Sequence, residues 1–209
     1  MQILTHPAQL QCLEGILRKS LPLALPVFGA VLNINRGNPG QFEVLVDKWP
    51  EFGAVLARPS GEVASGGHAA LHGGGEVCDT VPWPGALGSD LGVLGAGLGY
   101  WAHWKQGFGP APGVRVGSLQ PSHVDLLNDT WPYGGNARSR RYLAEILGRF
   151  PQVCLQDGSG QPVAWVLTDH FGTGTHSYTL PEQRRRGHMQ VALTVAAQRA
   201  QARGFPTFG

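Results

Sequence analysis

The sequence predicts an α/β protein in which helices flank a sheet, and three observations support this. Residues 114–203 alternate between strand-like and helix-like stretches in the order β-α-α-β-β-β-α. Residues 1–60 contain one amphipathic stretch and several apolar ones, which predicts a separate N-terminal αβ segment. Between these parts, residues 61–113 are rich in glycine and follow neither pattern.

The N-terminal segment starts with an amphipathic helix over residues 9–20. Apolar residues recur there at helical spacing, the last turn is basic, and Pro22 follows. We expect this helix to pack on a core, which is a commoner role than lying on a membrane. The elements expected next are a short strand (27–34), a turn (35–40), a strand or a helix (42–48) and a strand (52–56).

The glycine-rich segment 61–113 has few charged residues and no sustained period. Glycine loses the most conformational freedom on folding, so this composition argues against a packed core. Trp83, Trp101 and Trp104 nevertheless make it more apolar than an ordinary linker. We therefore treat it as an irregular segment, for which two origins stay open: an artefact of the gene model or a divergent insertion.

The C-terminal part, residues 114–209, carries the alternating elements. Apolar periodicity and turn residues place strands at 114–119, 153–156, 163–168 and 173–180, and helices at 123–131, 136–150 and 189–203. Ser122 is a candidate N-cap for the first of these helices. The Asp-Gly-Ser-Gly sequence at 157–160 predicts a hairpin turn, and Gly204 ends the last helix.

The run YTLPEQRRRGHMQ at 178–190 indicates a strand end, an arginine-rich turn and the start of a helix. A helix N-terminus presents unpaired backbone N–H groups and a partial positive charge, so it favours a phosphate. Three consecutive arginines add positive charge, and Gly187 lets the backbone approach a ligand closely. We refer to residues 184–190 as the Arg/Gly turn. A plain solvated basic turn is the competing interpretation.

Composition excludes several classes of function. The net charge of +2 is too small for a nucleic-acid-binding surface, and no apolar run reaches the roughly 20 residues of a membrane span. The N-terminus lacks the pattern of a signal peptide. Cys12, Cys78 and Cys154 are too widely spaced for a zinc site or a disulfide framework, so no metal is expected.

Six sequence motifs, in order, carry a resemblance to a known family. They are VFGAVLNINRGNP (27–39), VDKWPEF (46–52), NDTW (128–131), GGNARS (134–139), PVAW (162–165) and YTLPE (178–182). Together they resemble the glycine N-acyltransferase family, in particular its "-like" members, within the GNAT superfamily of acyl-CoA N-acyltransferases. The spacing Arg-x-x-Gly-x-Met at 184–189 is similar to the pyrophosphate loop of that superfamily, although Met189 departs from the usual Gly or Ala.

The resemblance implies a GNAT-type mixed sheet with flanking helices and the reaction acyl-CoA + glycine → N-acylglycine + CoA. Acyl-CoA would be a co-substrate, with no permanently bound cofactor. The backbone near Leu180 would polarise the thioester carbonyl. The residues implied in CoA binding are Tyr178, Leu180, Arg184, Arg185, Arg186, Gly187, His188, Met189 and Gln190.

The position of the general base is where this sequence departs most from the family pattern. The family is expected to use a glutamate near the start of the strand that leads to the Arg/Gly turn, and an ungapped match places this position at Thr173. A threonine hydroxyl cannot act as a base near neutral pH. His176 is a candidate substitute base because imidazole has a suitable intrinsic pKa, and Asp169 and His170 lie nearby. Alternatively, the amine arrives deprotonated and the enzyme only positions it.

The resemblance also bears on the extent of the chain. The strands and helix that complete a GNAT domain would follow residue 209, so we expect a C-terminally truncated domain. A catalytically inactive CoA-binding or structural product is therefore the alternative function. The family implies a mitochondrial location, although residues 1–20 make a poor presequence and leave the cytoplasm open. We expect a monomer.

Overall fold

The computed structural model describes residues 1–61, 81–82 and 110–206, which divide into two compact units. His170–Gly172 belongs to the first unit, and the remainder of the described chain from residue 110 onward forms the second. Most of the glycine-rich segment 61–113, with its tryptophans and glycine runs, lies outside the described residues, as do residues 207–209.

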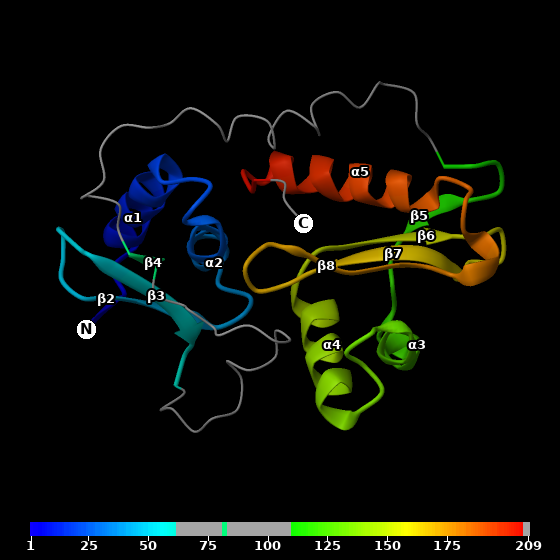
Figure 1. The fold of residues 1–209 in the computed structure, drawn as a ribbon, viewed down its shortest axis with the longest axis horizontal. Coiled ribbons are helices and arrows are strands. Elements are labelled where there is room, and N and C mark those ends of the chain that lie inside the picture. The colour runs from blue at the N-terminus through cyan, green and yellow to red at the C-terminus, as the bar shows by residue number, and fades with distance from the viewer. Residues whose placement is uncertain (62–80, 83–109, 207–209) are drawn as a thin grey trace. The chain divides into compact units, whose positions relative to one another are not determined.

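The first unit is a sheet with two helices on one side of it (Figure 1). Its strands pair antiparallel in the order β1 (Gln2–Leu4), β2 (Phe42–Val46), β3 (Ala54–Pro59) and β4 (Val81–Pro82), and its helices are α1 (Pro7–Lys19) and α2 (Leu25–Asn35). The predicted amphipathic helix is confirmed as α1, which buries Leu10, Leu13 and Leu17. Of the two conformations left open for residues 42–48, the strand forms.

The strand predicted over residues 27–34 is wrong, because this run lies inside α2. Every residue from Val27 to Asn33 is buried, so its apolar pattern has no polar side from which a period could be seen. Pro26 in the first turn is compatible with a helix start. Gly29 lets the backbone of Phe171 approach α2 closely, and Asn33 Nδ2 donates a hydrogen bond to the His170 carbonyl at 2.8 Å.

The second unit is a sheet covered by helices on both faces (Figure 1). Its strands pair antiparallel in the order β5 (Arg115–Gly117), β6 (Gln152–Gln156), β7 (Pro162–Thr168) and β8 (Gly174–Thr179). α3 (Val124–Thr130) and α4 (Ala137–Arg149) cover one face, and α5 (His188–Ala202) covers the other. The predicted α/β class and the predicted element order of this part are confirmed.

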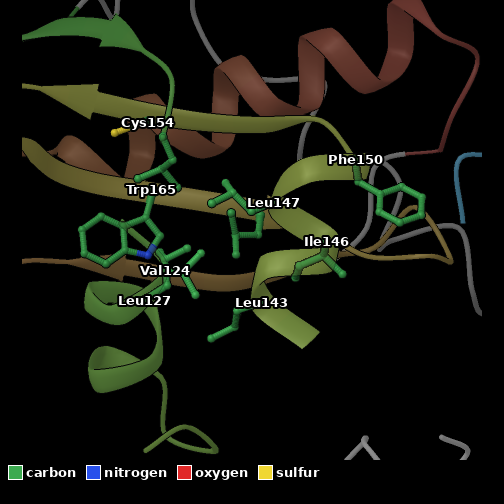
Figure 2. Packing of buried hydrophobic residues seen from close by; sticks show 10 residues of the cluster. Val124, Leu127, Leu143, Ile146, Leu147, Phe150, Cys154 and Trp165 are labelled. Atoms are coloured by element: carbon green, nitrogen blue, oxygen red, sulfur yellow. The ribbon is translucent and has the colours of Figure 1, made fainter. Parts of the chain in front are cut away.

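Alternate residues of the central strands enter two separate cores. Cys154 and Trp165 point toward α3 and α4, where they meet Leu127, Leu143 and Leu147 (Figure 2). Neighbouring residues of the same strands pack on the other face, against Val191 and Ala192 of α5. Because both faces are buried, β7 is an almost continuous apolar run.

The helix that follows β5 begins differently from the expectation. Ser122 was expected to cap it, but Ser122 lies inside a 3₁₀ turn, η1 (Pro121–His123), and α3 starts after it. The Gln120 N–H donates instead to His123 Nδ1 at 2.9 Å. The Ser122 prediction is wrong because the 3₁₀ turn moves the helix start beyond its reach.

Candidate functional site

The start of α5 has no side-chain cap. The helix follows a 3₁₀ turn, η2 (Pro181–Gln183), and its N-cap is Gly187 in the left-handed conformation, φ 77°. Glycine has no side chain with which to accept from the first helical N–H groups, and no capping hydrogen bond is present. Arg185 is also left-handed, φ 62°. The N–H groups of the first turn are therefore left for water or for a ligand.

Three exposed arginines surround this helix start. Arg184 lies over the ring of Tyr178, 5.4 Å from its centroid, and its Nε donates to the Thr179 carbonyl at 3.1 Å. Arg186 donates to the Gln183 amide oxygen at 3.2 Å. No carboxylate of the described residues pairs with Arg184, Arg185 or Arg186. Their positive charge is thus uncompensated at the positive end of α5.

Two buried polar side chains beside this turn have no hydrogen-bond partner among the described residues. They are His188, only 2% exposed and lacking a partner at both ring nitrogens, and Thr179, whose Oγ1 is buried. Burial, followed by the charge of Arg186, lowers the pKa of His188, so its ring is neutral at pH 7. A buried polar group without a partner costs about 1–3 kcal/mol, which a ligand able to hydrogen-bond would offset.

Met189, the departure from the superfamily pattern, packs toward the core. It is half-buried against the apolar cluster between α5 and the sheet. Its side chain therefore serves packing, and its backbone N–H stays in the first turn of α5 with those of His188 and Gln190.

β8 contains a bulge at His176. The register on either side is set by the pairs Leu167↔Thr175 and Trp165↔Tyr178. Two residues of β8, His176 and Ser177, consequently stand opposite Val166 alone. His176 has a left-handed backbone, φ 41°. One extra residue reverses the alternation of everything downstream in the strand, so the bulge decides which backbone groups of Thr179 and Leu180 face β7.

The backbone N–H of Leu180 is engaged in the sheet, because it donates to the Val163 carbonyl at 3.0 Å. Hydrogen-bonded and non-hydrogen-bonded pairs alternate along antiparallel strands, so Thr179, opposite Ala164, directs its N–H away from β7. Among the described strands, β8 is at the edge of the sheet, and this N–H faces that open edge. Sequence periodicity could not single out Thr179, because the bulge is visible only in the register.

His176 itself is buried beneath aromatic rings. Its Nε2 lies 2.7 Å from the Leu127 carbonyl, and since a carbonyl can only accept, Nε2 carries the hydrogen. Its ring lies near those of Trp131, Trp165 and Tyr178. Burial lowers the pKa of His176, against a smaller raising effect of the Leu127 hydrogen bond. The ring is therefore neutral at pH 7, with Nδ1 as its basic atom.

The other candidate residues lie at the opposite end of β8 from the Arg/Gly turn. Thr173 closes the β7–β8 hairpin: its N–H donates to Asp169 Oδ1 at 2.9 Å, and the Asp169 N–H donates to its carbonyl at 3.0 Å. His170 stacks on Phe42 of the first unit, with centroids 5.0 Å apart. The six residues of β8 separate Thr173 from the Arg/Gly turn, about 20 Å at the usual strand rise. The structure thus does not bring Thr173 to that turn.

The described residues hold no group of three or more His, Cys, Asp or Glu side chains placed to bind a metal ion. Within the same part of the chain, no helix has the length and apolar character needed to cross a membrane.

The second unit thus defines a class: an α/β protein whose edge strand runs into an uncapped, arginine-rich helix start. Comparison with known proteins identifies the family. The family model described as "Aralkyl acyl-CoA:amino acid N-acyltransferase" matches residues 1–68 and 102–151, more than half of the chain. The chain belongs to this family. The internal gap of the match, residues 69–101, falls inside the glycine-rich segment, and residues 152–209 lie outside the match.

Individual relatives agree with the family match. The "Glycine N-acyltransferase-like protein Keg1" of Mus musculus is 31% identical over 253 aligned positions, which cover 95% of this chain and 85% of the relative. Glycine N-acyltransferase of Bos taurus is 29% identical over 261 positions, covering 100% and 88%. Glycine N-phenylacetyltransferase of Bos taurus is 28% identical over 258 positions, covering 98% and 88%. These alignments exceed the 209 residues of the chain, so the relatives contain internal segments that this chain lacks.

Proposed function

We propose that this protein transfers an acyl group from acyl-CoA to the amine of glycine, giving N-acylglycine and CoA. The observation that carries the proposal is the start of α5. It is uncapped and bears three arginines that have no carboxylate partner among the described residues. It also adjoins buried groups of His188 and Thr179 that lack partners in the same part of the chain. These features fit an anionic ligand in a chain whose relatives are named glycine N-acyltransferases.

In this proposal the Arg/Gly turn holds the pyrophosphate of CoA. The backbone N–H groups of His188, Met189 and Gln190 would donate to it, and Gly187 leaves room for its approach. Arg184, Arg185 and Arg186 would balance its charge. Tyr178 and Leu180, at the end of β8, would border the pantetheine arm as it leaves the turn.

The thioester carbonyl would be polarised by the N–H of Thr179, which faces the open edge of β8. The amine nitrogen attacks the thioester carbon, the C–S bond breaks, and CoA leaves as the thiol after it takes the proton that the amine releases. Before the attack, the ammonium form of glycine must lose a separate proton, and two routes remain for this step: His176 Nδ1 takes it as a base, or the amine is deprotonated before it binds. We favour the second, because His176 is buried and its Nε2 is bonded to Leu127.

CoA binding without transfer is the second candidate function. The observation that favours it is Thr173 at the position where the family is expected to carry a glutamate. The mitochondrial location expected from the resemblance and a monomeric state are part of our main proposal. Microscopy of a tagged chain and sedimentation test them.

Product formation tests the proposed function. The purified 209-residue chain is incubated with glycine and either benzoyl-CoA or octanoyl-CoA, and N-acylglycine is measured by mass spectrometry. Thermal unfolding with and without CoA is recorded in parallel, since a ligand at a hundredfold excess over Kd stabilises by about 2.7 kcal/mol. Product together with stabilisation supports the transferase. Stabilisation without product supports the second function. If no product forms and CoA does not stabilise the protein, both functions are contradicted.

A matched pair of variants tests the role of the Thr179 backbone. Thr179→Pro removes the N–H at an edge position where proline does not interrupt the ladder, whereas Thr179→Ala keeps it. Loss of one oxyanion donor lowers kcat by about 10² to 10³. We expect such a loss only for Thr179→Pro, with CoA still stabilising both variants. Equal activity of the two variants would show that another group polarises the carbonyl.

A further inference from the structure

The bulge of β8 places a residue other than glycine in a conformation that glycine usually occupies. His176 has φ 41°, in the left-handed region, at the position where such bulges commonly carry glycine. A left-handed backbone in a non-glycine residue costs about 1–3 kcal/mol and persists only when its surroundings impose it. Strain of this kind is found preferentially near functional sites.

A hydrogen bond from the side chain of His176 holds this backbone conformation. The ring Nε2–H donates to the carbonyl of Leu127 in the last turn of α3. That carbonyl also accepts from the Trp131 N–H at 3.1 Å and, at 3.3 Å, from the Thr130 hydroxyl, so the His176 bond at 2.7 Å is the shortest of its three contacts. The bond thereby ties β8 to α3 across 49 residues of sequence.

Aromatic packing fixes the imidazole further. The ring is stacked on Trp131 at 5.9 Å and meets Trp165 edge-on at 6.1 Å. Trp165 in turn stacks on Tyr178, the first residue after the bulge, with ring centroids 5.4 Å apart. His176 is only 7% exposed, so close packing holds its ring in place.

The consequence of the bulge appears at Thr179. Without the extra residue, Thr179 would occupy the place in the alternation that Leu180 holds now, and its N–H would point into the ladder with β7. With the bulge, that N–H faces the open edge, and the Thr179 side chain lies on the α5 face beside the Arg/Gly turn.

We infer that His176 is a positioning residue: through its bond to Leu127 it fixes the bulge that presents the Thr179 N–H to the acyl carbonyl. This inference rests on the proposed function, and it assigns His176 a role other than that of base. In this role the hydrogen-bond donor and the packed side chain matter, and basicity does not.

Two substitutions separate the roles. His176→Gln can keep an N–H donor near the position of Nε2 but cannot act as a base near neutral pH. His176→Phe keeps a flat ring but loses the donor and leaves the Leu127 carbonyl short of one partner. We expect His176→Gln to retain most of the wild-type kcat. We expect His176→Phe to lose about a hundredfold in kcat, as for a reacting group displaced by about 1 Å, with little change in the Kd of CoA.

A His176→Gln variant that binds CoA but has lost turnover would overturn the inference in favour of a base, as would full activity of His176→Phe. If His176→Phe does not fold, two measurements still test the inference: the turnover of His176→Gln and the protonation of the two ring nitrogens in the wild type. Nitrogen NMR should show the tautomer protonated at Nε2, and a ring protonated at Nδ1 would contradict the bond. An inactive wild type would instead count against the proposed function. The bulge is then read from amide exchange at Tyr178, whose N–H points into the ladder in the present register and should exchange faster only in His176→Phe.

Discussion

The N-termini of α4 and α5 in the second unit begin in opposite ways. At α4, Asn136 Oδ1 accepts from the N–H groups of Arg138 and Ser139, at 3.0 and 2.9 Å, and Ser139 Oγ accepts in return from the Asn136 N–H at 3.2 Å. Ser139 Oγ also donates to Asn128 Oδ1 at 2.6 Å. At α5 the corresponding position is Gly187, which has no side chain to accept anything.

The two helices carry similar charge at these ends, and this makes the difference informative. Arg138, Arg140 and Arg141 stand in the first turns of α4, much as Arg184 to Arg186 stand before α5. At α4, Arg140 pairs with Asp125 at 2.6 Å. At α5 the arginines have no carboxylate partner among the described residues, and buried groups of Thr179 and His188 also lack partners. The difference therefore favours the start of α5, and not that of α4, as the candidate anion site.

The largest effect is expected from removing the charge at α5. Arg184→Gln, Arg185→Gln and Arg186→Gln combined should weaken CoA binding about thirtyfold or more, since hydrogen bonds to charged groups contribute about 1.5–3 kcal/mol each. The arginines are exposed, so the free energy of unfolding should change little. The matched control, Arg138→Gln with Arg141→Gln at α4, should leave CoA affinity unchanged. Calorimetric titration measures both, and an equal loss in the two variants would contradict a site at α5.

Acidification should destabilise the protein through the two buried histidines, one of them at the start of α5. Burial lowers the pKa of His176 and of His188 below the ordinary 6.5 of the unfolded chain. As the pH falls through 6.5, the unfolded chain binds protons first, so stability that is complete above 6.5 is lost toward lower pH. The slope is at most about 1.4 kcal/mol per pH unit for each histidine.

Urea unfolding between pH 8 and pH 5 measures this dependence. His188→Gln should lower the slope of stability against pH by at most about 1.4 kcal/mol per pH unit, the equivalent of one proton, and leave the contribution of His176. An unchanged profile would mean that His188 keeps an ordinary pKa in the folded protein.

A smaller effect is expected from removing the cap of α4. Asn136→Ala leaves the N–H groups of Arg138 and Ser139 without their acceptor and should cost about 1 kcal/mol of stability. Asn136→Asp keeps an oxygen acceptor and should cost less. Neither change should alter CoA affinity, because this helix start is satisfied by its own residues. Denaturant midpoints together with the Kd of CoA check both statements.

The smallest effect is expected at Cys154, in the closed core under α4. Burial raises the pKa of this thiol to about 12, so almost no thiolate is present at pH 8. A thiol reagent should modify the exposed Cys12 and leave Cys154 intact in the native protein, with or without CoA. Peptide mapping after brief labelling measures this, and rapid modification of Cys154 would show that the core opens.

Local sequence patterns were sufficient for most of the second unit. The apolar face of α4, with Leu143, Ile146 and Leu147, has a helical period, and its buried side is the expected one. The prediction of a strand at residues 27–34 was wrong because an apolar run buried on all sides shows no helical period in the sequence. β1 had no signal at all: its three residues become a strand only because β2 lies beside them.

The candidate site divides in the same way. The Arg/Gly turn could be found from sequence, because arginines, a glycine and a helix start are adjacent along the chain. The bulge at His176 could not, since it depends on how β8 is aligned with β7 and on a bond to Leu127, 49 residues away.

The sequence by itself determined the order of helices and strands in the second unit, the basic character of the turn before α5 and the resemblance to the family, because each is a property of neighbouring residues. The tertiary structure decided that α2 is a helix, that His176 is a buried donor, and that the Thr179 N–H faces the open edge. These depend on strand register and burial, which arise when residues distant in sequence pack together.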